Sequence, residues 1–189
     1  MLDKLNIFKL HGNLFLLFGA TNLLCYGLSL FMKPDNYEYH FGYAGDENRM
    51  FKPFKAMVGS NNFWNIAWTA PSIIGLGFFL SMKFSSLFMT KFFFLTMFSS
   101  YLFMTAFNPT SGFNFRLLQH YMPRFDSYEP TGKYVMGADT FAQSLIYFTL
   151  LHYGLWYVAL PFMVSDFLYY GPVTMGGPAA GLAAFLVLL

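Results

Sequence analysis

The sequence predicts an all-α, polytopic membrane protein with about five transmembrane helices and two structured loops rich in polar and aromatic residues. Three observations support this fold class. Hydrophobic residues make up 56% of the 189-residue chain. Charged residues make up only 11%, whereas a soluble domain carries about 25%. The apolar residues also gather into runs of about twenty, which is the length that crosses a bilayer as a helix.

We expect one transmembrane domain over residues 1–189. The five predicted spans are Asn13 to Met32, Phe63 to Met82, Ser86 to Phe107, Phe141 to Val164, and Phe167 to Leu189. A few residues around Lys83 separate the second and third spans, which predicts a tight antiparallel hairpin. The fifth span is interrupted by Gly-Pro and Gly-Gly-Pro, and these residues weaken its helical signal.

Two long polar loops, residues 33–62 and 108–139, separate the spans. Their wealth of Tyr, Phe, Gly and Pro is typical of loops that fold against other structure. Each contains a stretch that mixes cations with large apolar residues, "RMFKPFKAM" and "FNFRLLQHYMPRF". Such stretches lie in lipid headgroups, with Lys and Arg on the phosphates. We expect lipid contacts, cardiolipin included, at Lys52, Lys55, Arg116 and Arg124; contact with a neighbouring subunit fits the pattern equally well.

The composition argues against several classes of function. A net charge of +2 without a basic run does not indicate nucleic-acid binding. A single cysteine, Cys25, allows no internal disulfide and no cysteine cluster for zinc or iron–sulfur. Ion-coupled carriers keep charged groups near the membrane midplane, whereas Asp166 lies at the end of a predicted span. We therefore expect no catalytic residues, no metal site and no intrinsic cofactor.

His152 requires an explanation because it lies within the apolar stretch "TLLHYGLWYV" of the fourth predicted span. Haem ligation needs a second histidine at the same depth, but His11, His40 and His120 lie outside the predicted spans. A pocket for haem or quinone formed with Tyr153 and Trp156 is a second interpretation. The default interpretation is a hydrogen bond between helices. The partners considered for it are Thr21, Asn22, Ser99 and Ser100.

The stretch "GGPAAGLAAF" near the C-terminus predicts a helix-packing face. Gly177 and Gly181 form a G-x-x-x-G pattern, and Ala184 follows on nearly the same face. Small residues at this spacing let two helices approach closely. The stretch also resembles the G-x-S-G segment of rhomboid intramembrane proteases, with Ala179 or Ala180 in place of the serine. Alanine has no hydroxyl to activate, so this resemblance implies an inactive rhomboid-like protein.

The Phe- and Met-rich spans and the phrase "YEYHFGYAGDENRMFKPFKAMVGSNNFWNIAW" carry a second resemblance. In this style the chain resembles the lineage-specific membrane subunits of ciliate mitochondrial respiratory complexes and ATP synthase. The resemblance implies a non-catalytic, supernumerary, multi-pass subunit of the mitochondrial inner membrane. Such a subunit contributes assembly, bridging and lipid contacts in the respiratory chain, with other subunits and phospholipids as partners.

Three alternatives remain open. The first is a membrane anchor of an electron-transfer complex, similar in role to the succinate dehydrogenase anchors, in which His152 and its aromatic neighbours contact haem or quinone. The second is a subunit of ATP synthase, and the third is the inactive rhomboid-like protein.

Overall fold

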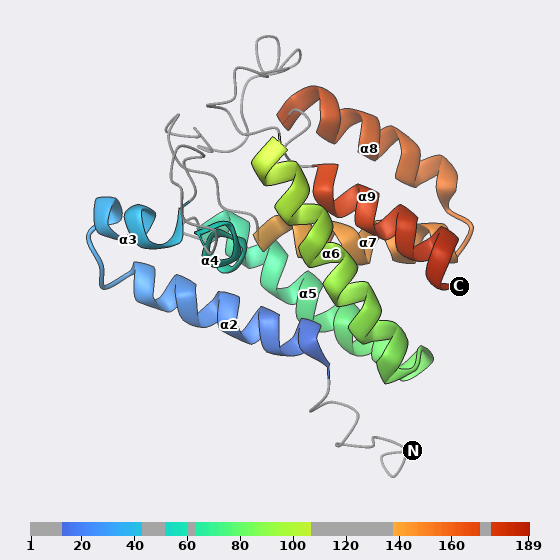
Figure 1. The fold of residues 1–189 in the computed structure, drawn as a ribbon, viewed down its shortest axis with the longest axis horizontal. Helices are drawn as coiled ribbons and strands as arrows, with labels where there is room; N and C mark the ends of the chain where they lie inside the picture. The colour runs from blue at the N-terminus through green and yellow to red at the C-terminus, as the bar shows by residue number, and fades with distance from the viewer. Residues whose placement is uncertain (1–12, 43–51, 60–62, 107–137, 171–174) are drawn as a thin grey trace.

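The computed structural model describes residues 13–42, 52–59, 63–106, 138–170 and 175–189, and all regular secondary structure within them is helical (Figure 1). This confirms the predicted all-α class. The elements are α2 (Leu14–Ser29), α3 (Pro34–Phe41), α4 (Lys52–Val58), α5 (Phe63–Lys83), α6 (Ser86–Ala106), α7 (Ala138–His152), α8 (Trp156–Tyr170), α9 (Gly176–Ala183) and a π-helical turn, η5 (Ala184–Leu188).

Helices α5 and α6 form the predicted hairpin, and their bounds agree with the second and third predicted spans to within one residue at each end. Ser85 sets the start of α6, because its Oγ accepts a hydrogen bond from the Phe88 N–H at 3.2 Å. Among the described helices, α5 and α6 are the two that are long and apolar enough to cross a membrane. The other predicted spans correspond to shorter helices, so a total of five spans remains a prediction.

The prediction of one continuous helix from Phe141 to Val164 is wrong. Helix α7 ends at His152 and α8 begins at Trp156. Between them Gly154 has φ +74°, a conformation that glycine adopts without steric cost. The N–H of Leu155 donates to the Leu150 carbonyl at 2.8 Å, and the N–H of Gly154 donates to the Leu151 carbonyl at 3.0 Å. These bonds form a Schellman motif, which stops the helix although the sequence stays apolar.

The first predicted loop contains two short helices, α3 and α4. Helix α4 packs on α6, with the ring of Phe54 stacked on Tyr101 at a centroid distance of 5.3 Å. Met57, also in α4, is fully buried in the core. Most of the second predicted loop lies outside the described residues; its last two residues, Ala138 and Asp139, begin α7.

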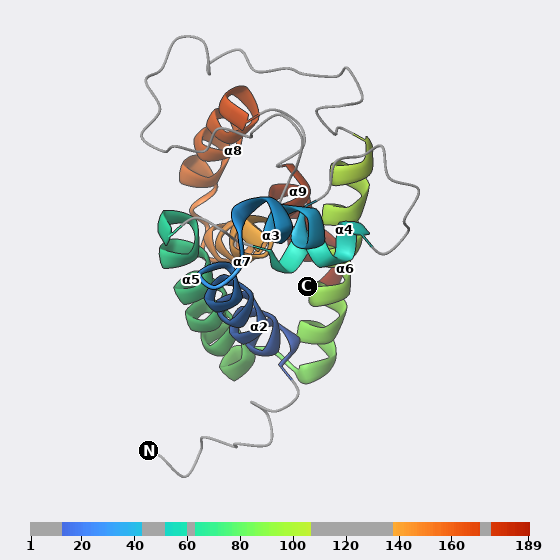
Figure 2. The same cartoon turned by 90° about the vertical axis from the view of Figure 1, so that its left-hand side faces the viewer.

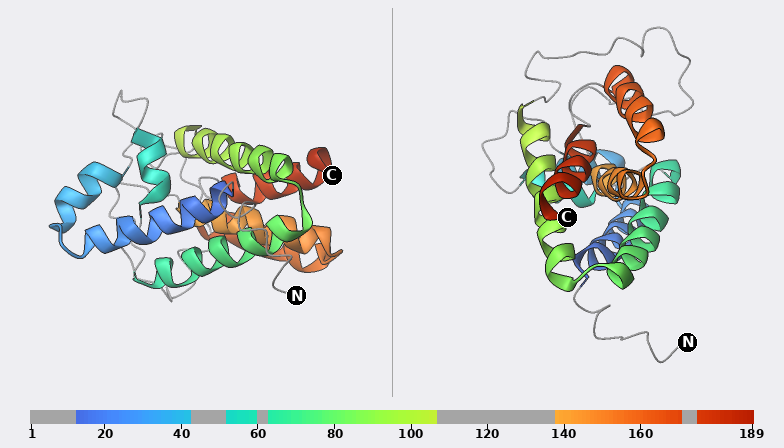
Figure 3. Two further views of the ribbon diagram at one scale, coloured as in Figure 1. Left: turned by 90° about the horizontal axis from the view of Figure 1, so that it is seen from below. Right: turned by 90° about the vertical axis from the view of Figure 1, so that its right-hand side faces the viewer.

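Helices α5 and α6 meet at their turn and then diverge, and α7 and α9 lie in the opening between them (Figures 2 and 3). Helix α2 packs along α5. Phenylalanine rings fill the centre of this arrangement. Phe15 of α2 lies 5.2 Å from Phe92 of α6 between ring centroids, and Phe18 stacks on Phe141 of α7 at 3.9 Å. Rings from three helices therefore share one core, with α7 at its middle.

Candidate functional site

Helix α7 carries a row of buried polar side chains into the centre of the protein. Thr140, Gln143, Ser144 and Tyr147 are all buried. Their spacing of three and four residues places them on one side of the helix. Two helices supply polar and small residues opposite this row: α6 contributes Thr96 and Ser99, and α9 contributes its glycines. The four buried polar residues of α7 form one surface with Thr96, Ser99 and the glycines of α9. We call this set of residues the α7 seam.

Hydrogen bonds join the helices along the α7 seam. Thr96 Oγ1 donates to Ser144 Oγ at 3.1 Å, and Ser144 Oγ donates to the carbonyl of Phe141 at 2.9 Å. Ser99 Oγ donates to the carbonyl of Gly176 at 2.8 Å. Buried hydroxyls away from water are costly unless they are paired. The hydroxyls of Thr96 and Ser99 therefore link α6 to α7 and to α9.

The glycines of α9 allow the backbone of α9 to approach that of α7. A Cβ atom at Gly177 would lie 2.5 Å from the Thr140 carbonyl oxygen. One at Gly181 would lie 2.7 Å from the Ser144 carbonyl oxygen and 2.9 Å from the Phe148 nitrogen. Ala184, the third residue of the predicted packing face, is fully buried. The structure thus places all three residues inside the body, with both glycines directly against the backbone of α7.

Two acids lie near opposite ends of the buried row on α7, and sequence reasoning missed this acid cluster. Tyr147 Oη donates to Asp166 Oδ2 of α8 at 2.8 Å. Asp139 lies two turns before Tyr147, and its Oδ1 accepts from the Thr140 N–H at 3.0 Å. The regular spacing of Asp139, Gln143 and Tyr147 was a signal for this cluster. The sequence did not reveal the cluster because Asp139 was assigned to a loop. Asp166, in turn, reaches Tyr147 only because the chain reverses direction between α7 and α8.

The surroundings of these acids favour their protonated forms. Burial is the main cause that raises the pKa of Asp139 to about 6; the hydrogen bond from Thr140 opposes this, and the charge of Asp166 adds to it. Burial also raises the pKa of Asp166, and the hydrogen bond from Tyr147 offsets part of the effect. The Oε1 of Gln143 is buried and accepts no hydrogen bond from the described residues. Asp139 therefore holds its proton to a higher pH than an exposed aspartate does.

No described group of three or more His, Cys, Asp or Glu side chains is arranged to hold a metal ion. The cluster therefore consists of two acids and Tyr147. The hydrogen bond between Tyr147 and Asp166 attaches α8 to α7.

The structure places His152 at the end of α7, beside the turn between α5 and α6. Its ring lies 5.1 Å from the ring of Phe84 and 5.9 Å from that of Phe148, between centroids. The predicted hydrogen-bond partners bind elsewhere: Thr21 to the Leu17 carbonyl, Asn22 to the Val58 carbonyl, Ser99 to the Gly176 carbonyl, and Ser100 to the sulfur of Met104. The prediction of a hydrogen bond from His152 to one of these residues is therefore wrong.

The aromatic residues predicted to accompany His152 are exposed. Tyr153 lies against the His152 ring at 5.2 Å, and its hydroxyl accepts a hydrogen bond from Lys83 Nζ. Trp156 is 60% exposed, and its ring lies 6.2 Å from that of Tyr157 between centroids. The described residues do not enclose His152, Tyr153 and Trp156 as a pocket for a flat cofactor.

The residues predicted to bind lipid are only partly described. Lys52 and Lys55 belong to α4, and the Lys55 side chain is exposed. Nothing is described of the Lys52 side chain, and Arg116 and Arg124 lie outside the described residues. An exposed Lys55 is free to meet a phosphate or a neighbouring subunit, so both interpretations of this stretch stay open.

Comparison with protein-family models, with curated proteins and with solved structures found no match for this chain.

Proposed function

We propose that the protein is a non-catalytic structural subunit of a larger membrane complex, embedded in the bilayer through α5 and α6. The observation that carries this proposal is the distribution of side chains. Polar residues such as Asn22, Thr96 and Ser144 are fully buried, whereas many large apolar residues face outward. Large apolar side chains also fill the interior, but an outer surface this apolar is not what water favours. It suits a bilayer, where lipid tails cover apolar side chains and polar groups pair between helices.

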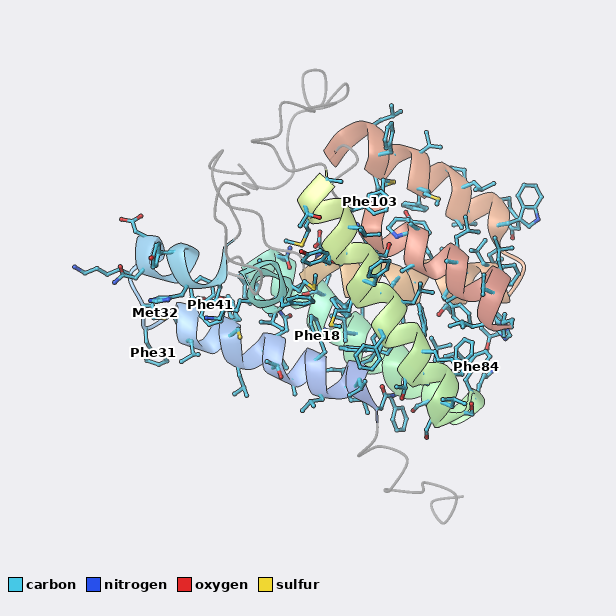
Figure 4. All side chains as sticks on the ribbon, viewed as in Figure 1. Phe18, Phe31, Met32, Phe41, Phe84 and Phe103 are labelled. Atoms are coloured by element: carbon cyan, nitrogen blue, oxygen red, sulfur yellow. The ribbon has the colours of Figure 1, made fainter. Side chains whose placement is uncertain are left out.

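The outward apolar residues form stripes along the helices. On α6 they are Leu87, Phe94, Phe98 and Leu102, spaced by four or seven residues along one face. On α2 the exposed apolar residues include Leu17, Leu24 and Leu28, and Phe31 projects from the end of that helix with 90% of its surface exposed (Figure 4). Contiguous apolar surface of this kind marks contact with lipid or with another protein. Both are available to a subunit inside a membrane complex.

The polar residues of the interior support a structural role. Asn13 Nδ2 donates to the Gly77 carbonyl at 2.8 Å and so joins α2 to α5. Asn22 Nδ2 donates to the Val58 carbonyl at 2.9 Å and so joins α2 to α4. The α7 seam joins three further helices. The hydrogen-bonding groups of these residues serve contacts between helices, which is the use expected of a scaffold.

The finer proposal is a supernumerary subunit of a respiratory-chain complex in the mitochondrial inner membrane. It rests on the resemblance in sequence style given above, and ATP synthase is the alternative complex. In this setting the outer faces of α2 and α8 meet lipid, cardiolipin included, or neighbouring subunits. His152 lies at a helix end among phenylalanine rings, so the proposal assigns it a packing role.

Mild extraction of native membranes tests this proposal. An affinity-tagged chain is solubilised in gentle detergent, resolved on a native gel and identified together with its partners by mass spectrometry. We expect the chain to migrate in an assembly far larger than its own 21.7 kDa, with respiratory-complex subunits. Recovery of a stable, monodisperse monomer with enzymatic or transport activity of its own would contradict the proposal.

A further inference from the structure

Two turns lie side by side at one end of the body. The first joins α5 to α6 through Phe84 and Ser85, and the second joins α7 to α8 through residues 153–155. Lys83 Nζ donates to Tyr153 Oη across them, and the rings of Phe84 and His152 are 5.1 Å apart. Both turns lie at the same end of the body in Figure 3. We call this end the two-turn end.

The exposed side chains of the two-turn end are of the kind found where a membrane meets water. Trp156 is 60% exposed, Tyr157 59% and Tyr153 45%. Trp and Tyr are enriched at this boundary because their rings are apolar and their N–H and O–H groups remain hydrated. Exposed apolar surface begins close by: Leu87, one residue into α6, is 65% exposed. The change from aromatic-polar to apolar surface occurs within a turn of helix.

Two lysines supply the charge expected at that boundary. Lys83, the last residue of α5, holds its ammonium 5.0 Å from the centre of the Phe79 ring and 4.9 Å from that of Tyr153. Lys91 lies on the exposed stripe of α6, about 7.5 Å along the helix from Ser86. Helical side chains lean toward the N-terminus of their helix, so the stem of Lys91 leads back toward the two-turn end. A lysine in this position places its ammonium at the interface while its stem stays in lipid.

From this arrangement we infer that the two-turn end lies in the headgroup layer of the bilayer, with Lys83 and Lys91 facing lipid phosphates. The inference rests on the proposed membrane location and deepens it by placing the turn between α7 and α8 at the same membrane surface as the turn between α5 and α6. It places His152 at headgroup depth. It also places Phe94, about 12 Å along α6 from Ser86, near the middle of a hydrocarbon core about 30 Å thick.

Tryptophan quenching by brominated lipids measures these depths. The chain has three tryptophans, Trp64, Trp68 and Trp156. One variant keeps Trp156 alone, with Trp64→Phe and Trp68→Phe. The matched variant carries Trp64→Phe, Trp68→Phe and Trp156→Phe. Its single tryptophan is introduced by Phe94→Trp, at an exposed position of α6. Both full-length proteins are reconstituted into phosphatidylcholine vesicles with one-fifth phosphatidylglycerol, brominated near the headgroup or near the chain end. Phe98→Trp, on the same stripe, replaces Phe94→Trp if that variant does not fold.

We expect bromine near the headgroup to quench Trp156 more strongly than bromine near the chain end, and the reverse order for Phe94→Trp. If both tryptophans are quenched best by deep bromine, the two-turn end is buried in the bilayer. The inference is then wrong while the membrane location stands. If deep bromine quenches neither variant, the proposed membrane location itself fails, and the inference fails with it.

Discussion

Helices α8 and α9 follow one another in the chain and are both apolar, yet they occupy opposite environments. Helix α9 is inside: five of its eight residues, Gly176, Gly177, Pro178, Ala180 and Gly181, are buried. Helix α8 is outside: among its described side chains Ala159 alone is buried, while Trp156, Leu160 and Phe162 are exposed. The small residues of α9 let it pack closely on α7, whereas the larger side chains of α8 stay outside. This is expected where lipid removes the hydrophobic drive for helices to associate.

The largest expected effect comes from enlarging the glycines of α9. Gly177→Leu and Gly181→Leu each place atoms where backbone atoms of α7 already lie within 3 Å of a Cβ position. Overpacking of this kind costs about 1–3 kcal/mol or more. We expect each variant to lose a large part of its thermal stability in detergent, measured by circular dichroism.

Leu186→Ala is the matched control, because Leu186 lies in the turn that follows α9 and is 68% exposed. We expect its melting temperature to be close to that of the unmodified protein. If the two leucine variants have the same melting temperature as the control, α9 is not held by a small-residue contact. Side-chain size would then not explain the difference between α8 and α9.

A smaller effect is expected where α8 is attached. Tyr147→Phe removes the hydroxyl that donates to Asp166. A hydrogen bond between membrane helices contributes about 0.6–1.7 kcal/mol. We expect amide hydrogen exchange to accelerate along α8 while α9 stays protected. Tyr157→Phe is the control, since its ring is 59% exposed. Equal exchange in both variants would show that other contacts hold α8.

The extent to which the sequence predicted the fold differs from helix to helix. The bounds of α5 and α6 could be predicted because long apolar runs end there at Lys83 and at the capping residue Ser85. The end of α7 was missed because hydropathy continues through it. Gly154 was the local signal, but glycine is also common within membrane helices, so its left-handed conformation had to be seen in the structure.

The candidate site was predicted only in part. The spacing of Gly177 and Gly181 indicated a packing face, and the structure shows which backbone it meets. The pairing of Tyr147 with Asp166 depends on the reversal of the chain after α7, so a sequence interpreted as one continuous helix placed them apart. His152 was expected inside a long span, whereas the structure makes it the last residue of α7.

The most direct test of the central claim is to label the protein from inside the bilayer. A small apolar diazirine is dissolved in the lipid of vesicles that contain the protein, activated by light, and its adducts are mapped by mass spectrometry. We expect adducts on the outward face of α6, at Phe94, Phe98 and Leu102. We expect little labelling at Thr96, Ser99 and Ser100, which are buried on the same helix. Equal labelling of the two faces, or an unlabelled outward face, would contradict a body with its polar residues inside and its apolar residues in lipid.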